Sequence, residues 1–155
     1  MTADDRPVIA DLLRRTSEFN AMDVTVAEEL IDTYLMNPVE SGYHIQVIEA
    51  DGKTAGYVCY GEAPLTEGSW DVYWIAVAPE EQGKGLGKAL LKAAEDSARA
   101  ARGRLLFIET SSKPEYERTR QFYYSQHYQF ICQITDYYTT GDDKVIFQKR
   151  LLNNF

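Results

Sequence analysis

The sequence predicts a mixed α and β protein in which one mostly antiparallel sheet is flanked by helices. Three observations support this fold class. Two helical segments come first, a β-hairpin follows them, and a strand, a glycine-rich segment, a helix and a further strand come next. At 155 residues and 45% hydrophobic composition, the chain has the size and apolar content of one domain, and we expect residues 1–155 to form it.

The two helices are predicted from their apolar spacing and capping pattern. Residues 8–19 carry Ile9, Leu12 and Leu13 at helical spacing. A second helix is predicted to start at Thr25, because Glu28 follows it at the spacing of a capping box.

Two strands follow the helices. Residues 43–49 and 54–60 are rich in β-forming residues and are separated by a turn that contains Asp51-Gly52. Such a short connection predicts that the two strands pair antiparallel.

A strand, a helix and a strand come next. Residues 71–77 form an apolar run that ends before Pro79, and we expect this strand to be buried on both faces. Residues 85–101 are predicted to form a helix, because leucine and alanine recur on one of its faces. With a strand at residues 105–110, this order makes a βαβ unit, whose two strands are parallel.

The end of the chain is predicted to hold one more helix and a second hairpin. Pro114 suits the first turn of a helix that runs to about residue 126. Strands at residues 128–135 and 144–151 are separated by a turn at Gly141-Asp142.

Charge and cysteine content argue against several classes of protein. The 24 acidic residues outnumber the 16 basic residues, and the resulting net charge of -8 disfavours nucleic acid as a partner. No apolar run reaches the roughly 20 residues of a membrane span, so we expect a cytoplasmic protein without a membrane partner. Cys59 and Cys132 lie far apart, and the two histidines are isolated, so we expect two core cysteines and no metal site.

The segment Gln82-Gly83-Lys84-Gly85-Leu86-Gly87-Lys88 lies where the apolar strand ends and the next helix begins. The first amides of a helix have no intrahelical acceptor, and together with the helix dipole they favour an anion. The glycines permit positive φ and close backbone approach, so a phosphate is the expected ligand, with Lys84 and Lys88 adding charge. A Walker A loop would need glycine at position 82, and a dinucleotide fingerprint would need it at position 88. A glycine-rich helix start without a ligand is the remaining alternative.

The same segment resembles the Gln/Arg-x-x-Gly-x-Gly/Ala motif of the GCN5-related N-acetyltransferase (GNAT) superfamily. Trp74-Ile75-Ala76-Val77 with Pro79 is similar to the fourth strand of that family, and Phe122-Tyr123 followed by His127-Tyr128 resembles its Phe-Tyr-x-x-x-Gly-Phe segment. The resemblance covers nearly the whole chain, from about residue 8 to residue 151. It implies the acyl-CoA N-acyltransferase fold and the use of acetyl-CoA as co-substrate.

Two departures from the family pattern are expected to have local effects. The family begins with a strand ahead of its first helix, and the few polar residues before residue 8 leave little room for one. We therefore expect the first strand to be missing or rudimentary. His127 stands where the family commonly has glycine, so we expect that helix end to close differently or to carry an unusual backbone geometry.

The resemblance also assigns the cofactor contacts. It implies that the pyrophosphate of acetyl-CoA lies over residues 82–88. It further implies that backbone groups of Ile75, Ala76 and Val77 pair with the pantetheine as a further strand would, and that an amide there polarises the thioester carbonyl.

Tyr123 and Asp71 are the residues expected to carry acid–base chemistry. Tyr123 matches the tyrosine of the family, and its phenol, with a reference pKa of about 10, can protonate a departing thiolate. Packing of its helix on the sheet is a second role for the same residue. Asp71 occupies a position similar to the acidic residue that some members use as a base. A solvated aspartate at a strand start is the alternative, with Glu109 or a water chain then acting as the base.

The direction of the Asp71 side chain depends on the regularity of its strand. By simple alternation Asp71, Tyr73, Ile75 and Val77 share one face. A β-bulge, which this strand carries in the family, would break that count.

The favoured function is therefore acetylation of a primary amine on a small molecule, amino acid or peptide. A non-catalytic acyl-CoA-binding regulatory module is the alternative, since it would keep residues 82–88 without needing Tyr123 or Asp71. Acidic residues in the 62–69 loop, such as Glu62 and Glu67, favour a cationic acceptor. A homodimer is left open.

Overall fold

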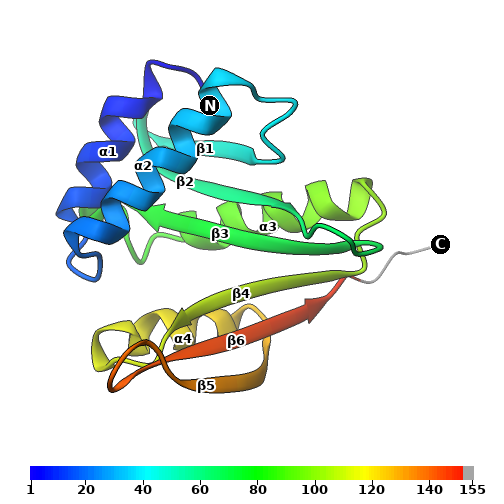
Figure 1. The fold of residues 1–155 in the computed structure, drawn as a ribbon. Helices are drawn as coiled ribbons and strands as arrows, with labels where there is room; N and C mark the ends of the chain where they lie inside the picture. Colours follow the sequence, from blue (N-terminus) through cyan, green and yellow to red (C-terminus); the bar gives the residue numbers. More distant parts are fainter. Residues whose placement is uncertain (152–155) are drawn as a thin grey trace.

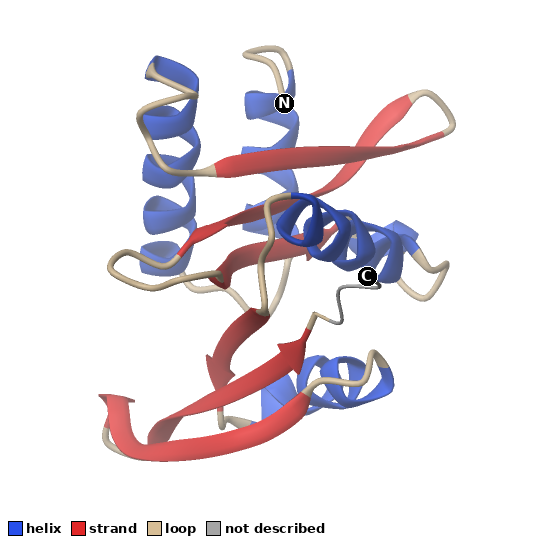
Figure 2. Ribbon diagram, turned by 90° about the vertical axis from the view of Figure 1, so that its right-hand side faces the viewer, coloured by secondary structure: helices blue, strands red, loops and turns tan. Residues whose placement is uncertain are grey.

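The computed structural model describes residues 1–151 and has the predicted fold class (Figures 1 and 2). Within that range six strands form one mixed, mostly antiparallel sheet in the order β1-β2-β3-β4-β6-β5. The helices α1 and α2 cover one face, and α3 and α4 cover the other. The elements are α1 (Asp5–Arg15), α2 (Ala21–Met36), β1 (His44–Ala50), β2 (Lys53–Glu62), β3 (Ser69–Val77), α3 (Leu86–Ala100), β4 (Leu105–Ser111), α4 (Glu117–Ser125), β5 (Gln129–Thr139) and β6 (Asp142–Arg150).

The chain enters α1 at Asp5, without a preceding strand among the described residues. As expected from the few residues before position 8, no strand precedes α1 within residues 1–151, and β1 forms one edge of the sheet. The predicted bounds of the first helix were too late, since α1 begins three residues before position 8 and ends at Arg15.

The predicted cap of the second helix was wrong. The capping box is formed by Asn20 and Asp23, and the Asn20 side chain accepts hydrogen bonds from two first-turn amides at 2.8 and 2.9 Å. Thr25 lies inside α2 instead, where its hydroxyl donates to the carbonyl of Ala21 at 2.9 Å. The Thr25 to Glu28 spacing matched the motif by chance, and the functioning motif, Asn20 to Asp23, lies five residues earlier.

The strands occur where they were predicted, most of them longer than expected, while β1 keeps its length and is shifted by one residue; Asp142, predicted to lie in the last turn, begins β6. β1 and β2 pair antiparallel around Asp51 and Gly52, both of which have positive φ. β3 and β4, which α3 connects along the chain, pair in parallel, as a βαβ unit requires. The helix predicted from residue 114 divides into a short 3-10 turn, Pro114–Tyr116, followed by α4.

His127 closes α4 in the left-handed conformation, with φ of 66°. Its amide donates to the carbonyl of Tyr124 at 2.9 Å. The unusual geometry expected at this position is confirmed, because a histidine occupies a backbone conformation that favours glycine.

Two apolar clusters stabilise the two faces of the sheet. One joins α1 and α2 to the sheet through residues such as Ile9, Ile31 and Tyr57, and the other joins α3 and α4 to it through Leu91 and Phe147. All of these side chains are almost completely buried.

Of the two cysteines, Cys59 is buried, as expected, and Cys132 is exposed. The core assignment of Cys132 was wrong because this residue lies on β5, at the second edge of the sheet, where all residues are exposed.

Candidate active site

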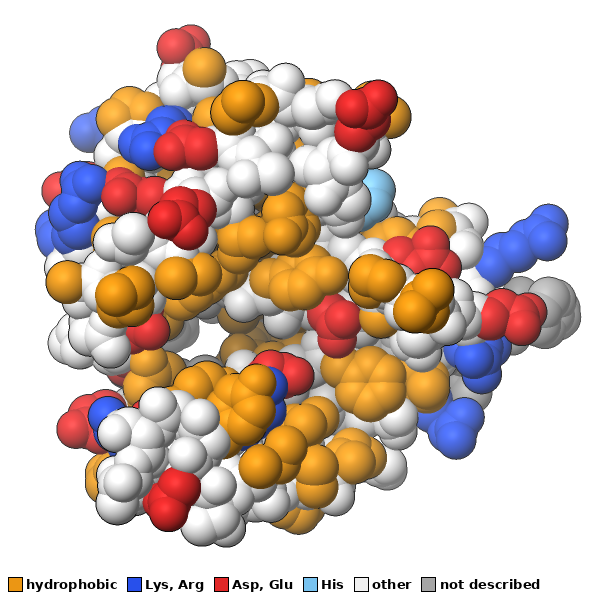
Figure 3. All heavy atoms as spheres, viewed as in Figure 1, with side chains coloured by type: hydrophobic (Ala, Val, Ile, Leu, Met, Phe, Trp, Pro, Cys, Tyr) orange, Lys and Arg blue, Asp and Glu red, His pale blue; other side chains and the backbone are white. Residues whose placement is uncertain are grey.

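The parallel strands β3 and β4 separate after a short paired stretch. Residues 69–72 pair with residues 105–108, whereas residues 73–77 have no partner on the β4 side in the part of the chain that the structure describes. Figure 1 shows the two strands diverging towards their C-terminal ends. Figure 3 shows a hollow between the β1–β3 half and the β4–β6 half, in which hydrophobic and acidic side chains gather. The open edge of β3 can therefore pair with an extended ligand.

A β-bulge at Tyr73 sets which side chains face this opening. Cys59 of β2 lies opposite Trp74, but the next residue lies opposite Val72, so Tyr73 is the extra residue. Val72 points into the cluster under α3, and beyond the bulge Ile75 packs against that same cluster. Trp74 packs on the α1 and α2 side.

Asp71 lies on the α1 and α2 side, because its neighbours Trp70 and Val72 point to the opposite face. The bulge at Tyr73 then reverses the alternation, so Ile75 and Val77 lie on the α3 and α4 side. Asp71 therefore does not share a face with them, and simple alternation was wrong here. The prediction that β3 is buried on both faces was also wrong, since Tyr73 is 37% exposed.

The glycine-rich segment has the conformation of an anion cradle. Gly83 and Gly85 have φ of 76° and 87°, and Gly85 is the N-cap of α3. The first intrahelical bond runs from the amide of Ala89 to the carbonyl of Gly85, at 3.1 Å, so the amides of residues 86–88 have no intrahelical acceptor. A Cβ added at Gly83 would be 3.9 Å from its nearest neighbour, and one added at Gly85 would have no neighbour within 4 Å. The cradle is therefore open to solvent.

Gly87 faces α4. A Cβ at this position would lie 3.4 Å from the ring of Phe122, which is an ordinary van der Waals contact, so packing alone does not require glycine here. The Gln82 side chain fixes the entrance to the segment, because its Nε2 donates to the carbonyl of Val77 at 3.2 Å. The open edge of β3 is thereby joined to the cradle.

The two lysines of the segment have different surroundings. Lys84 Nζ lies 3.0 Å from Glu81 Oε2, so part of its charge is neutralised within the chain. Lys88 borders a pocket between α3 and the turn after α4, together with Lys92, Glu95, Arg99 and Lys149. Glu95 pairs with Arg99 and Lys149 at 3.1 and 2.8 Å, and Lys92 pairs with Asp96, so these three cations are largely neutralised within the chain. Lys88 is the cation of this group that adds charge beside the cradle.

Tyr123 is buried in the cluster on the α3 and α4 side. Its ring packs against Tyr128 and Phe147, with ring centroids 6.2 and 5.6 Å away. Burial raises the pKa of Tyr123, so the phenol is protonated at neutral pH. The ring of Tyr123 therefore packs in the apolar cluster, and its protonated hydroxyl is able to donate a proton.

Asp71 is half-buried and has no ion-pair partner among residues 1–151. Burial raises its pKa, the nearby carboxylate of Glu109 raises it further, and Lys144 opposes the rise. A raised pKa makes the Asp71 carboxylate a better proton acceptor than a solvated aspartate.

Lys144 is a site residue that sequence reasoning missed. Its Nζ lies 2.6 Å from Glu109 Oε2 and 3.8 Å from the ring centroid of Tyr137. Tyr73 and Tyr43 meet edge to face at 5.4 Å on the same side of the sheet. No spacing in the sequence signals this group, because its members come from strands that are distant along the chain.

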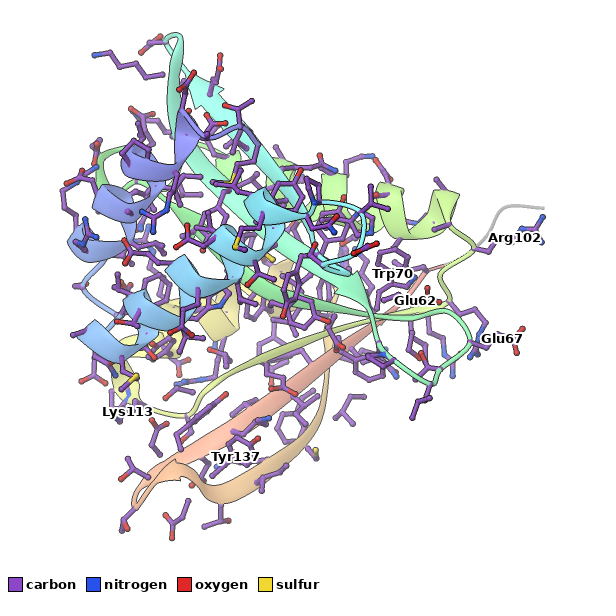
Figure 4. The ribbon with its side chains drawn as sticks, turned by 45° about the horizontal axis from the view of Figure 1, so that its top comes forward. Glu62, Glu67, Trp70, Arg102, Lys113 and Tyr137 are labelled. Atoms are coloured by element: carbon purple, nitrogen blue, oxygen red, sulfur yellow. The ribbon has the colours of Figure 1, made fainter. Side chains whose placement is uncertain are left out.

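Glu62 and Glu67 lie elsewhere. Figure 4 shows both near Trp70 and Arg102, at the opposite end of the sheet from Lys113 and Tyr137. The loop is tied down by Arg104, whose guanidinium donates to the carbonyl of Glu67 at 2.6 and 2.8 Å. The acidic residues near the opening are Asp71 and Glu109 instead, so the structure does not bring the 62–69 loop to the open end of β3.

Two further findings concern other kinds of site. Within residues 1–151 no group of three histidine, cysteine, aspartate or glutamate side chains is arranged to hold a metal ion. Over the same residues, no helix has the length and apolar character that crossing a membrane requires.

The sequence matches a model of the acetyltransferase (GNAT) family over residues 8–128. A solved structure of a protein assigned to the GNAT family, from Desulfovibrio desulfuricans, is 39% identical with a TM-score of 0.92. The match covers 97% of this chain and 94% of that chain. No match is found among curated proteins.

Two more distant structures share the fold. The ribosomal-protein-S18-alanine N-acetyltransferase of Escherichia coli is 20% identical with a TM-score of 0.75, over 100% of this chain and 95% of that chain. YncA of Salmonella typhimurium, solved with acetyl-CoA, is 19% identical with a TM-score of 0.72, over 97% of this chain and 91% of that chain. At these identities the likeness concerns the fold alone.

Proposed function

The chain belongs to the GNAT family of acetyltransferases, and from this premise we propose that it is an N-acetyltransferase. It moves the acetyl group of acetyl-CoA directly to a primary amine of a small molecule, amino acid or peptide. Residues 1–155 form one domain for this activity.

The observation that carries this proposal is the continuous path from the open edge of β3 to the glycine cradle. Residues 73–77 offer unpaired backbone groups, and Gln82 joins their end to residues 83–88. Pantetheine would pair with the open edge, near Ile75, Ala76 and Val77, and the pyrophosphate would meet the free amides of the cradle. Bound acetyl-CoA supplies the thioester, and an amide of the open edge polarises its carbonyl.

The separation of β3 and β4 also lets the cofactor and the acceptor amine approach from opposite faces of the sheet. Tyr123 lies on the α3 and α4 side with the cradle, whereas Asp71 and Glu109 lie on the other side. The gap between β3 and β4 connects the two sides. An amine that enters beside Asp71 therefore reaches a thioester held on the cofactor side without displacing it.

The proton transfers follow from these positions. Asp71, with its raised pKa, takes a proton from the incoming ammonium group and leaves a neutral amine as nucleophile. The carbon–sulfur bond of the thioester breaks as the carbon–nitrogen bond forms. Tyr123 gives its proton to the departing sulfur and recovers one from the acylated nitrogen, so the protons balance.

Two experiments test the proposal. Calorimetry measures the binding of coenzyme A, and a screen of amines then measures the release of free thiol from acetyl-CoA. Tyr123→Phe is expected to lower kcat by roughly 100-fold or more with nearly unchanged affinity for coenzyme A. Tyr124→Phe is the matched control, since the neighbouring ring is 46% exposed and should tolerate the change.

The outcomes separate the competing functions. Heat of binding without thiol release for any amine would favour a non-catalytic acyl-CoA-binding module. Absence of binding to coenzyme A by folded protein would refute both functions.

A further inference from the structure

The glycine cradle has a basic neighbour on a second helix. Arg118 is the second residue of α4, and its Nη2 would lie 3.9 Å from a Cβ added at Gly83. Apart from the residues that adjoin Gly83, no other part of residues 1–151 would come within 4 Å of that Cβ. Gly83, with φ of 76°, therefore leaves the space in front of the guanidinium open.

Arg118 lies on the face of α4 that packs against the start of α3. Phe122 follows it by four residues, so the two side chains lie on the same face of the helix. The ring of Phe122 is the nearest neighbour of a Cβ added at Gly87, at 3.4 Å. Because Gly83 and Gly87 stand at the two ends of the run of glycines, this face of α4 extends alongside the whole cradle.

The charge of Arg118 is not neutralised within the described part of the chain. Arg120, on the same helix, lies 2.7 Å from Glu117, and Gln121 donates to that carboxylate at 2.8 Å. Glu117 therefore already has partners, and Arg118 forms neither an ion pair nor a side-chain hydrogen bond with any of residues 1–151. Its side chain is exposed.

Free basic side chains are uncommon in this protein. Most lysines and arginines form an ion pair or a side-chain hydrogen bond, and the exceptions within residues 1–151 are Lys53, Lys88, Arg102, Arg118 and Arg150. Lys88 belongs to the glycine-rich segment and Arg118 reaches it, so two free cations border the cradle. In a chain with a net charge of -8, free cations at this place favour an anionic ligand.

We propose that Arg118 binds the diphosphate of coenzyme A from α4, while the free amides of residues 86–88 bind it from α3. A guanidinium suits this ligand, because its planar set of N–H groups donates in pairs to phosphate oxygens. The inference rests on the proposed use of acetyl-CoA and adds a binding residue from outside the glycine-rich segment. The segment alone does not reveal this residue, because positions 83 and 118 become neighbours only when α4 packs on α3.

Calorimetry with coenzyme A tests the inference on the full chain. Arg118→Ala is expected to raise the Kd for coenzyme A roughly 10- to 100-fold, since the charge-assisted contacts of one guanidinium are lost. Arg118→Lys keeps the charge without the paired donors, so its Kd should lie between those of wild type and Arg118→Ala.

Arg150→Ala is the matched control. It removes the same charge from an exposed arginine that has no ion pair within residues 1–151, and Arg150 lies opposite Leu105, at the start of β4. Its Kd for coenzyme A should stay within about twofold of wild type, because solvent and salt screen a distant exposed charge. Thermal unfolding of Arg118→Ala should occur at the wild-type temperature, since the exposed side chain has no partner to lose.

Dephospho-coenzyme A identifies the phosphate that Arg118 contacts. This molecule keeps the diphosphate and lacks the separate phosphate on the ribose, so Arg118→Ala should weaken its binding by the same factor as that of coenzyme A. A loss seen with coenzyme A alone would place Arg118 at the ribose phosphate and overturn the inference. Equal affinity of wild type and Arg118→Ala for coenzyme A would overturn it too, and would leave the proposed acetyl transfer standing. Wild-type protein that gave no heat with coenzyme A would refute both.

Discussion

Replacing Gly85 by alanine tests the anion cradle at the start of α3. Gly85 is the N-cap, with φ of 87°, and a Cβ at this position would meet no other protein atom within 4 Å. The added methyl group therefore causes no clash within the chain. It would project into the space where the pyrophosphate is proposed to lie, and it would keep the phosphate oxygens away from the neighbouring amides.

Two costs follow from this geometry. An L side chain in the left-handed region costs roughly 1–2 kcal/mol of folding stability. Loss of one hydrogen bond between a backbone amide and a charged phosphate costs a further 1.5–3 kcal/mol, approximately, in binding alone. The Kd for coenzyme A should therefore rise by roughly 10- to 100-fold.

Gly141→Ala separates the two costs. Gly141 has φ of 81° in the β5–β6 turn, and a Cβ there also meets no atom within 4 Å. Thermal unfolding should show a similar loss of stability for both variants, whereas calorimetry with coenzyme A should show weaker binding only for Gly85→Ala. If Gly85→Ala bound coenzyme A as tightly as wild type, the assignment of the cradle would be incorrect.

Two other predictions concern acidic residues. Asp71→Asn should lower kcat roughly 100-fold or more and remove the acidic limb of the pH profile of kcat/KM, because the carboxyl group must be ionised to accept a proton. Because the pKa of Asp71 is raised in the folded protein, its contribution to stability is greatest below its unfolded-state pKa. It is lost as the pH rises through the folded value, so Asp71→Asn should unfold at the same or a higher temperature at neutral pH. An acidic limb that survives in this variant would point to another base.

Glu95→Ala should lower the free energy of unfolding by about 3 kcal/mol. The buried carboxylate of Glu95 accepts hydrogen bonds from the buried hydroxyl of Tyr128 at 3.1 Å and from the partly buried Lys149 at 2.8 Å, and the variant leaves both donors without this acceptor. Asp96→Ala, at the exposed neighbour, should change the free energy of unfolding by only about 0.5 kcal/mol in urea unfolding, and equal losses would contradict the role of the buried pair.

Local patterns in the sequence were sufficient for the order of the elements. The Asp51-Gly52 turn and the strand end before Pro79 each depend on the conformational preferences of a few adjacent residues. The glycine cradle was predictable for the same reason, since positive φ at Gly83 and Gly85 is a property of those positions themselves. The unusual geometry at His127 was expected only from the resemblance to the family, which commonly has glycine there.

The cap of α2 shows where local patterns fail. Two capping motifs were present within nine residues, one at Asn20 to Asp23 and one at Thr25 to Glu28. Packing of α2 against the sheet through Val24 and Ala27 requires a helix that starts before Thr25, and so selects the earlier motif. A motif alone carries no information about this packing.

The sequence by itself determined the elements, their order and the cradle, because these depend on interactions within about one turn of helix or one tight turn. Only the tertiary structure decided the side chains around the opening. The bulge at Tyr73, the meeting of Asp71 with Glu109 and Lys144, and the exposure of β5 all depend on which strands become neighbours and in which register. A shift of one residue in register turns every later side chain to the opposite face, so these features arise only when the sheet has formed.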